Sequence, residues 1–113
     1  MARDIEFDEG SEVILSASNV DDGAGIFVDG NKIVHVNFNG SGSTTLKMVQ
    51  GHSYVVKFEL WNMTGGAYHG IFRIRGIQAG KKAEPFHHDR PGQSGPMPVV
   101  WQETVVLRPR KWP

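Results

Sequence analysis

The dipeptide Asp29-Gly30, with an apolar run on either side, constrains the fold of this chain more than any other feature. Ile26-Phe27-Val28 precedes it, and Ile33-Val34 follows it. A two-residue type I′ turn between antiparallel strands needs positive φ angles at both central residues, and Asp-Gly adopts them readily. The pattern therefore predicts a β-hairpin over residues 26–38.

Alternation of apolar and polar side chains extends this prediction along the chain. In residues 53–61, the even-numbered side chains from Tyr54 to Leu60 are apolar, whereas Lys57 and Glu59 lie between them. Such a period of two is typical of a strand with one buried face. The other predicted strands are residues 13–18, 26–28, 32–38, 44–49, 68–75 and 99–107, with residues 1–11 as an arm or a short edge strand.

These segments make seven or eight short strands with turn residues at each gap, and none has a helical period. The 14 glycines and 6 prolines fit a chain rich in turns. We predict an all-β fold, an antiparallel two-sheet sandwich that is jelly-roll-like, as a single domain over residues 1–113.

Residues 77–98 interrupt the strand pattern. They contain four prolines, Pro85, Pro91, Pro96 and Pro98, and no β run. Loops of this length in compact domains are usually functional or mobile, so the segment is predicted to be a long loop. Both a role in contacting a partner and simple mobility fit the residues.

Charge limits the function classes. The formal net charge is zero, which gives no reason to expect nucleic-acid binding, and no apolar stretch approaches a membrane span. Acidic residues dominate residues 1–31 and basic residues dominate residues 71–113. The two ends are expected to lie side by side; contact between subunits of a homo-oligomer is the other interpretation.

The chain has no cysteine, so disulfides, thiolate zinc sites and thiol nucleophiles are excluded. Its polar start lacks the apolar core of a signal peptide. The localisation is therefore unknown, and either cytoplasmic synthesis or a module excised from a longer protein fits.

Two adjacent acids, Asp21 and Asp22, precede a glycine next to the predicted hairpin. Calcium prefers several oxygen ligands from loops, and Asp29 or Asn19 could add oxygens to this pair. The alternative is a turn in which the aspartates accept hydrogen bonds from local amides. Asp21, Asp22 and Asp29 are the candidate metal ligands.

An aromatic group follows the best-patterned strand. Trp61 falls on the polar side of that strand, and Asn62, Tyr68 and His69 lie close to it in sequence. Sugar rings stack on aromatic faces while amides and other polar groups bond the hydroxyls, so these four are the candidate ligand-binding residues. The alternative is that Trp61 packs under another part of the protein.

Support for catalysis is weak. No nucleophile motif is present. Glu59 and Glu103 are the pair of carboxylates that could flank a glycosidic bond, although Glu59 is expected to pair with a basic neighbour. His87-His88-Asp89 could bind a transition metal, but a solvated loop explains it as well.

Residues 19–34, with the aspartate pair, a glycine and a strand ending in an Asp-Gly hairpin, resemble the central motif of the anthrax protective-antigen N-terminal domain family. Residues 44–60 and Gly65-Gly66-Ala67 look like the next parts of that family, so the resemblance covers about residues 16–75. Other galactose-binding-like jelly rolls carry similar pieces. The resemblance implies a lectin-like β-sandwich, carbohydrate binding, and Asp21 and Asp22 as calcium ligands.

The sequence thus predicts a non-catalytic, lectin-like carbohydrate-binding module, soluble and assisted by calcium. A structural or assembly subunit of a virion, fibre or secretion apparatus is the first alternative, and a small hydrolase is the second. Neither a nucleic acid nor a membrane is an expected partner.

Overall fold

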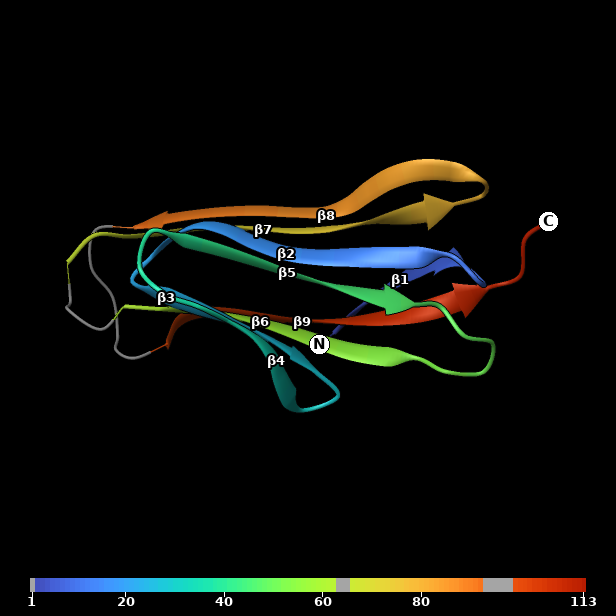
Figure 1. The fold of residues 1–113 in the computed structure, drawn as a ribbon, viewed down its shortest axis with the longest axis horizontal. Coiled ribbons are helices and arrows are strands. Elements are labelled where there is room, and N and C mark those ends of the chain that lie inside the picture. The colour runs from blue at the N-terminus through green and yellow to red at the C-terminus, as the bar shows by residue number, and fades with distance from the viewer. Residues whose placement is uncertain (1, 63–65, 93–98) are drawn as a thin grey trace.

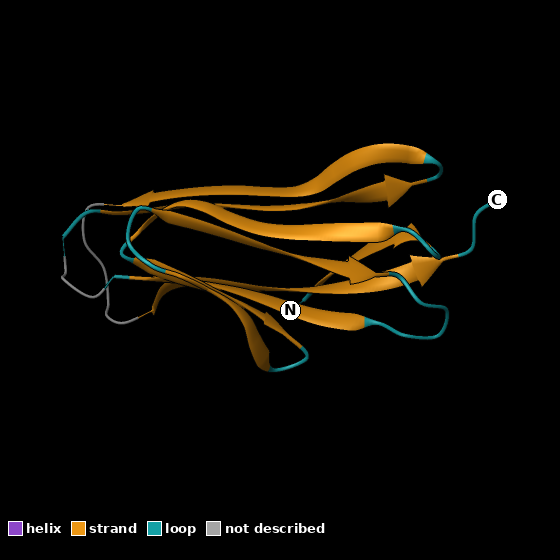
Figure 2. Cartoon of the chain, viewed as in Figure 1, coloured by secondary structure: helices purple, strands orange, loops and turns teal. Residues whose placement is uncertain are grey.

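In the computed structural model the chain folds into a β-sandwich, and residues 2–62, 66–92 and 99–113 are described (Figures 1 and 2). Those ranges contain no helix long and apolar enough to cross a membrane. Their nine strands are β1 (Arg3–Asp8), β2 (Glu12–Asp21), β3 (Gly23–Val28), β4 (Asn31–Val36), β5 (Gly40–Lys47), β6 (Tyr54–Trp61), β7 (Tyr68–Gln78), β8 (Lys81–Gly92) and β9 (Val99–Arg110).

The strands form two layers that run along the length of the molecule (Figure 1). The five-stranded sheet has the order β1-β9-β6-β3-β4, and the four-stranded sheet has the order β5-β2-β7-β8. The predicted all-β two-sheet sandwich is confirmed. Two details of the prediction are wrong: the described residues form nine strands rather than seven or eight, and β1 pairs in parallel with β9.

The parallel pair places the acidic start of the chain against its basic end. Nε of Arg108 on β9 donates a hydrogen bond to Oδ2 of Asp4 on β1 at 3.1 Å. Ile5 and Phe7, which alternate with the acids of β1, are buried. The side-by-side arrangement of the two ends is thus confirmed, and β1 is anchored by its apolar face as well as by its charges.

The core forms from the alternate residues that the sequence pattern predicts to point inward. Val56, Phe58 and Leu60 of β6 are completely buried. The ring centroid of Phe58 lies 5.3 Å from those of Phe72 on β7 and Phe86 on β8, so Phe58 joins the two sheets. Aromatic rings at this spacing contribute to stability beyond the area that they bury.

Phe38 departs from the strand predicted over residues 32–38. The alternation puts it on the same face as Val34 and Val36, but Val36 is buried whereas Phe38 is 60% exposed. The strand ends at Val36, and Phe38 belongs to the turn that leads to β5. Strand alternation no longer applies beyond that point.

The Asp29-Gly30 hairpin is confirmed. Both residues have positive φ angles, 52° and 86°, and they join β3 to β4. The aspartate side chain stabilises this turn, because Oδ1 accepts a hydrogen bond from the amide of Val55 at 2.9 Å.

The predicted long loop over residues 77–98 is wrong for most of its length. Lys81–Gly92 form β8, which pairs antiparallel with β7 through a turn at Ala79 and Gly80. The prolines fit because β8 is an edge strand, where a missing N–H removes no bond to a second neighbour. Charged residues and prolines are common on such edges, since they discourage further pairing. Residues 93–98 lie outside the described residues.

Candidate functional site

Trp61 lies on the outer face of the five-stranded sheet. It ends β6 and pairs with Gly23 at the start of β3. Its neighbour Leu60 points into the core and is completely buried, whereas Trp61 is partly exposed. The partial exposure predicted from the strand pattern is confirmed, so part of the indole can contact another molecule.

Two glycines of β3 allow the indole to lie close against the sheet. A Cβ atom at Gly25 would lie 2.9 Å from Cζ2 of Trp61, and one at Gly23 would lie 3.0 Å from its Cε3. The six-membered ring of the indole therefore spans both glycines. A Cβ at Gly25 would also lie 3.0 Å from Cε1 of Phe27, the next outward side chain of β3. Any larger residue at position 25 would displace one of the two rings.

Hydrogen bonds fix the orientation of the indole. Nε1 of Trp61 donates to Oε1 of Glu59 at 2.9 Å. The second oxygen of the same carboxylate lies 3.0 Å from Nζ of Lys57. That ammonium lies 4.7 Å from the ring centroid of Phe27, within the range of a cation–π contact. The indole, the carboxylate and the second ring are thereby held as one connected group.

Strand β4 adds polar groups beside the indole. The ring of His35 lies 5.1 Å from that of Trp61, and Nζ of Lys32 lies 5.4 Å from the indole centroid. Nζ of Lys32 is also 3.1 Å from Nδ1 of His35, while Nε2 of His35 is 3.2 Å from Oδ1 of Asn37. An ammonium can only donate, so Nδ1 accepts and the imidazole proton sits on Nε2.

We call this group the aromatic platform; it consists of Phe27, Lys32, His35, Lys57, Glu59 and Trp61. It combines two aromatic rings with cationic, imidazole and carboxylate groups on one face of one sheet. Such a surface can stack against an apolar ring face and donate or accept hydrogen bonds around it.

The other three predicted ligand-binding residues do not join Trp61. Asn62 is completely buried, and its Nδ2 donates to the carbonyl of Gly66 at 2.9 Å. Tyr68 points into the core and is 8% exposed. His69 lies on the outer face of the four-stranded sheet, where Nδ1 meets the carbonyl of Asn19 at 2.9 Å. Closeness in sequence misled the prediction here, because adjacent residues on a strand face opposite sides.

The predicted metal ligands are also separated. Asp21 and Asp22 precede β3, and Asp29 follows it, so a strand of six residues, roughly 20 Å long, lies between them. Burial and a hydrogen bond to Asp22 raise the pKa of Asp21, and the negative charge of Asp22 adds to this rise. No group of three or more histidine, aspartate or glutamate side chains among the described residues is arranged to hold a metal ion.

Strand geometry also separates two pairs considered for other chemistry. Glu59 lies opposite Gln102 on the outer face, whereas Glu103 lies opposite Phe58, which faces the core. The two carboxylates are thus on opposite sides of one sheet and cannot flank a shared substrate. Glu59 has a basic partner, as predicted, in Lys57.

The adjacent histidines of β8 point to opposite faces. His87 lies outside, where Nδ1 is 2.9 Å from Oε2 of Glu84. His88 lies inside, where its ring stacks on Trp101 at 4.4 Å with an interplanar angle of 4°. The two imidazoles therefore cannot chelate one metal ion together.

Sequence reasoning missed most of the aromatic platform. Phe27, Lys32 and His35 were assigned only to strands, and Gly23 and Gly25 only to the region of a turn. Glycines at alternate positions, followed by an aromatic residue at the same spacing, were a usable signal. They put a strip without side chains on one face of a strand, where a neighbouring strand can place a large ring.

Comparison of the chain with models of known protein families, with curated proteins and with solved structures found no match. The resemblance to the protective-antigen family therefore stays a prediction.

Proposed function

We propose that this protein is a non-catalytic binding module that holds a carbohydrate on the aromatic platform. The observation that carries the proposal is the position of Trp61, whose indole lies over Gly23 and Gly25 and is fixed by Glu59. A ring held in this way loses little conformational freedom when a ligand stacks on it. The lectin-like jelly roll implied by the resemblance is part of the same proposal.

The groups around the indole suit the hydroxyls of a sugar. Lys32 has further N–H groups to donate and Glu59 has further lone pairs to accept hydrogen bonds. Both ring nitrogens of His35 are already engaged, Nδ1 with Lys32 and Nε2 with Asn37, so His35 helps to position the ammonium. Phe27 offers a second ring on the same strip of β3. Binding at a single shallow surface of this kind is weak, so several linked copies would raise the apparent affinity.

The proposal is for binding rather than catalysis. Glu59 is the one carboxylate of the aromatic platform, and both of its oxygens already interact, one with Trp61 and one with Lys57. A general acid in glycoside hydrolysis needs a second carboxylate across the bond. Glu103, the partner considered from the sequence, faces the opposite side of the sheet.

A glycan array followed by calorimetry on the best glycan tests the proposal. Trp61→Ala is expected to abolish binding while the circular dichroism spectrum stays that of the parent, because the side chain lies outside the core. Trp112→Ala is the matched control, since Trp112 is also a surface tryptophan, 49% exposed and distant in sequence from the aromatic platform. Retained binding in Trp61→Ala, or no glycan bound by the parent protein, would refute the proposal.

Calcium assistance is a separate part of the proposal and rests on Asp21 and Asp22 alone. The amide of Asp22 donates to the carbonyl of Trp61 at 3.2 Å, so a cation held by this pair would lie near the end of the aromatic platform. If calcium assists, a chelator weakens glycan binding in the parent and has no effect in Asp22→Asn. Equal affinity with and without chelator removes calcium and leaves the sugar site intact.

A structural or assembly subunit is the second candidate function. Two apolar side chains, Ile33 on edge strand β4 and Phe38 just after it, are 51% and 60% exposed. Exposed apolar groups near a sheet edge favour contact with another protein. Light scattering distinguishes the two functions: a homo-oligomer gives a mass that increases with concentration and falls in Phe38→Ser.

A further inference from the structure

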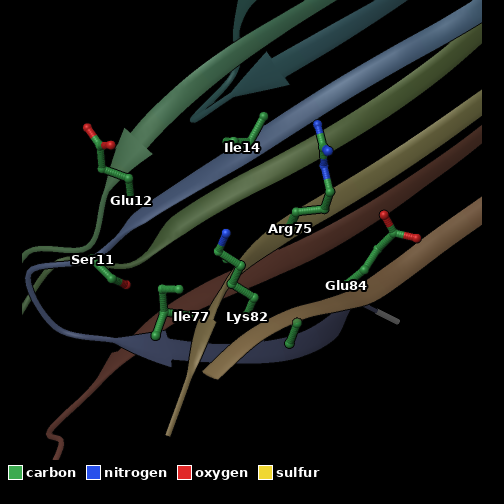
Figure 3. Close-up of a pocket in the computed structure, with 9 residues that line it drawn as sticks. Ser11, Glu12, Ile14, Arg75, Ile77, Lys82 and Glu84 are labelled. Carbon is green, nitrogen blue, oxygen red and sulfur yellow. The ribbon is translucent and has the colours of Figure 1, made fainter. Parts of the chain in front are cut away.

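The outer face of the four-stranded sheet carries a cavity of about 670 Å³, far from the aromatic platform. β2, β7 and β8 line it (Figure 3). Its apolar lining comes from Ile14, Ile77 and Ala83, and its charged lining includes Arg75 and Lys82. Pockets that bind small molecules commonly measure about 300–1,000 Å³ and combine an apolar surface with a few polar groups.

A bulge between β7 and β8 shapes this cavity. Ile74 pairs with Phe86 and Gly76 pairs with Ala83, so two residues of β8 lie opposite Arg75 alone. A bulge of this kind bends the strand that carries the extra residue and increases its twist. In Figure 1, the β7–β8 hairpin curves away from the rest of its sheet at this end. The curvature gives the face its concave form.

Two acids, Glu12 and Glu84, and two basic residues, Arg75 and Lys82, line the cavity, and these four described residues form no ion pairs with one another. Glu84 interacts with His87 at 2.9 Å and lies 4.0 Å from Nε of Arg73. Glu12 lies opposite Lys47 across the β2–β5 pair. Both acids thus have basic neighbours outside the cavity, and the positive charge of Arg75, which lines it, also contributes to lowering the pKa of Glu84.

Arg75 and Lys82 are in a different position. Neither side chain makes a hydrogen bond or an ion pair with any residue of the ranges 2–62, 66–92 and 99–113. Figure 3 shows both projecting from the same side of the sheet as Ile77. Two cations that make no hydrogen bond or ion pair within these ranges, beside an apolar surface, are complementary to a ligand that is anionic at one end and apolar at the other.

We propose that this cavity binds a small amphipathic carboxylic acid. Its carboxylate lies between Arg75 and Lys82, and its apolar body covers Ile14 and Ile77. Arg75 supplies the planar fork of donors that matches a carboxylate, and Lys82 adds a second positive charge. The site is separate from the carbohydrate proposal, because it lies on the other sheet and uses none of the same residues.

Titration with phenylpropionate, monitored by amide NMR shifts, tests this proposal, with phenylpropanol and phenylpropylamine as matched neutral and cationic probes. We expect phenylpropionate to shift the amides of Ile14, Ile77 and Ala83 and to bind most tightly of the three. Arg75→Gln and Lys82→Gln should each weaken its binding by about fivefold to tenfold, because each removes a charge-assisted hydrogen bond.

Lys81→Gln is the control, since Lys81 is an exposed lysine next to Lys82 that does not line the cavity, and it should leave the affinity unchanged. Weaker binding in added salt also supports a charge contact. Equal affinity for all three probes would overturn the proposal, as would shifts that map elsewhere. An unchanged affinity in both Arg75→Gln and Lys82→Gln would overturn it too. Loss of sugar binding in Trp61→Ala has no bearing on this result.

Discussion

The two outer faces of this sandwich use the same alternating strands in opposite ways. On the five-stranded sheet, glycines of β3 leave a bare strip on which Trp61 lies, and hydrogen bonds hold the ring in place. On the four-stranded sheet, aliphatic side chains line a cavity beside two cations that make no hydrogen bond or ion pair in the part of the chain that the structure describes. The first face is a fixed aromatic surface. The second is a concave, partly apolar surface that carries the basic side chains of Arg75 and Lys82.

The inward and outward residues of a strand are subject to different physical constraints. Inward positions must be apolar and must fit the shared core, so they limit one another. Outward positions affect the fold only weakly, and the two faces can carry unrelated chemistry on one scaffold. Each face can therefore be altered without the other, provided that the core between them stays intact.

Phe58→Ala should break both faces together. Phe58 is completely buried and contacts aromatic rings of the opposite sheet, so its truncation leaves a cavity in the core that both sheets share. We expect the free energy of unfolding to fall by about 3–5 kcal/mol. Urea unfolding followed by tryptophan fluorescence and by far-UV circular dichroism measures it. If the two probes give separate transitions, the faces belong to independent units.

Asp8→Ala should weaken the four-stranded face more than the other. Asp8 is buried, and its two carboxylate oxygens accept hydrogen bonds from the amides of Ala79 and Gly80, each at 2.8 Å. These bonds hold the turn of the β7–β8 hairpin that bears Lys82. Loss of a buried, charged acceptor should lower stability by about 2–3 kcal/mol.

Amide hydrogen exchange shows where the Asp8→Ala variant loosens. The increase should be concentrated in β7 and β8, with β3 and β6 little changed. Asp4→Ala serves as the control, since Asp4 is exposed in its pairing with Arg108 and should change stability by about 1 kcal/mol or less. Uniform loosening of all strands in Asp8→Ala would show that the carboxylate acts on the whole fold.

Gly25→Ala should affect only the aromatic platform. The new methyl group would lie 2.9 Å from the indole, so we expect a loss of about 1–2 kcal/mol and a change in tryptophan fluorescence. The same substitution in a Trp61→Ala background should cost less, because only the close approach to Phe27, at 3.0 Å, remains. Urea unfolding of all four proteins completes this double-mutant cycle. An equal loss in both backgrounds would mean that the glycine is needed for another reason.

The sequence predicted the elements that depend on local pattern. The Asp29-Gly30 hairpin, the buried face of β6 and the outward position of Trp61 follow from turn chemistry and a period of two, and all three are confirmed. β8 was missed because an edge strand pairs with one neighbour only. It can therefore carry prolines and charges that would break a central strand.

The candidate site was harder to predict because it depends on which strands are neighbours. The contact between Trp61 and Gly25 requires β6 to pair with β3 in one register, across a gap of more than thirty residues in the chain. The cavity likewise depends on a bulge between β7 and β8. Local periodicity specifies which face a residue occupies, but it carries no information on what lies beside it.

Two acids of the four-stranded sheet, one at the end of β2 and one on β8, should show the smallest effects on stability. Burial and Asp22 raise the pKa of Asp21 from its usual 3.8, whereas a hydrogen bond from His87, together with Arg73, lowers the pKa of Glu84 from its usual 4.5. The folded state thus holds the proton of Asp21 more tightly than the unfolded chain does. The resulting stabilisation is complete below pH 3.8 and is lost as the pH rises through the folded pKa. Glu84 behaves in the opposite way: its stabilisation is present above pH 4.5 and is lost as the pH falls through its folded pKa.

At neutral pH, therefore, Asp21→Asn should raise stability slightly and Glu84→Gln should lower it slightly. Both changes should stay within about 0.5 kcal/mol because solvent screens these partly exposed groups. Carboxyl NMR titration gives the direct measurement, with a midpoint above 3.8 for Asp21 and below 4.5 for Glu84. In His87→Ala the midpoint of Glu84 should move back toward 4.5 while that of Asp21 stays unchanged, since the two acids lie at different sites. If the midpoint of Asp21 moved as well, the two acids would be electrostatically coupled across the four-stranded sheet, and the end of β2 next to Trp61 could not be altered independently of the cavity.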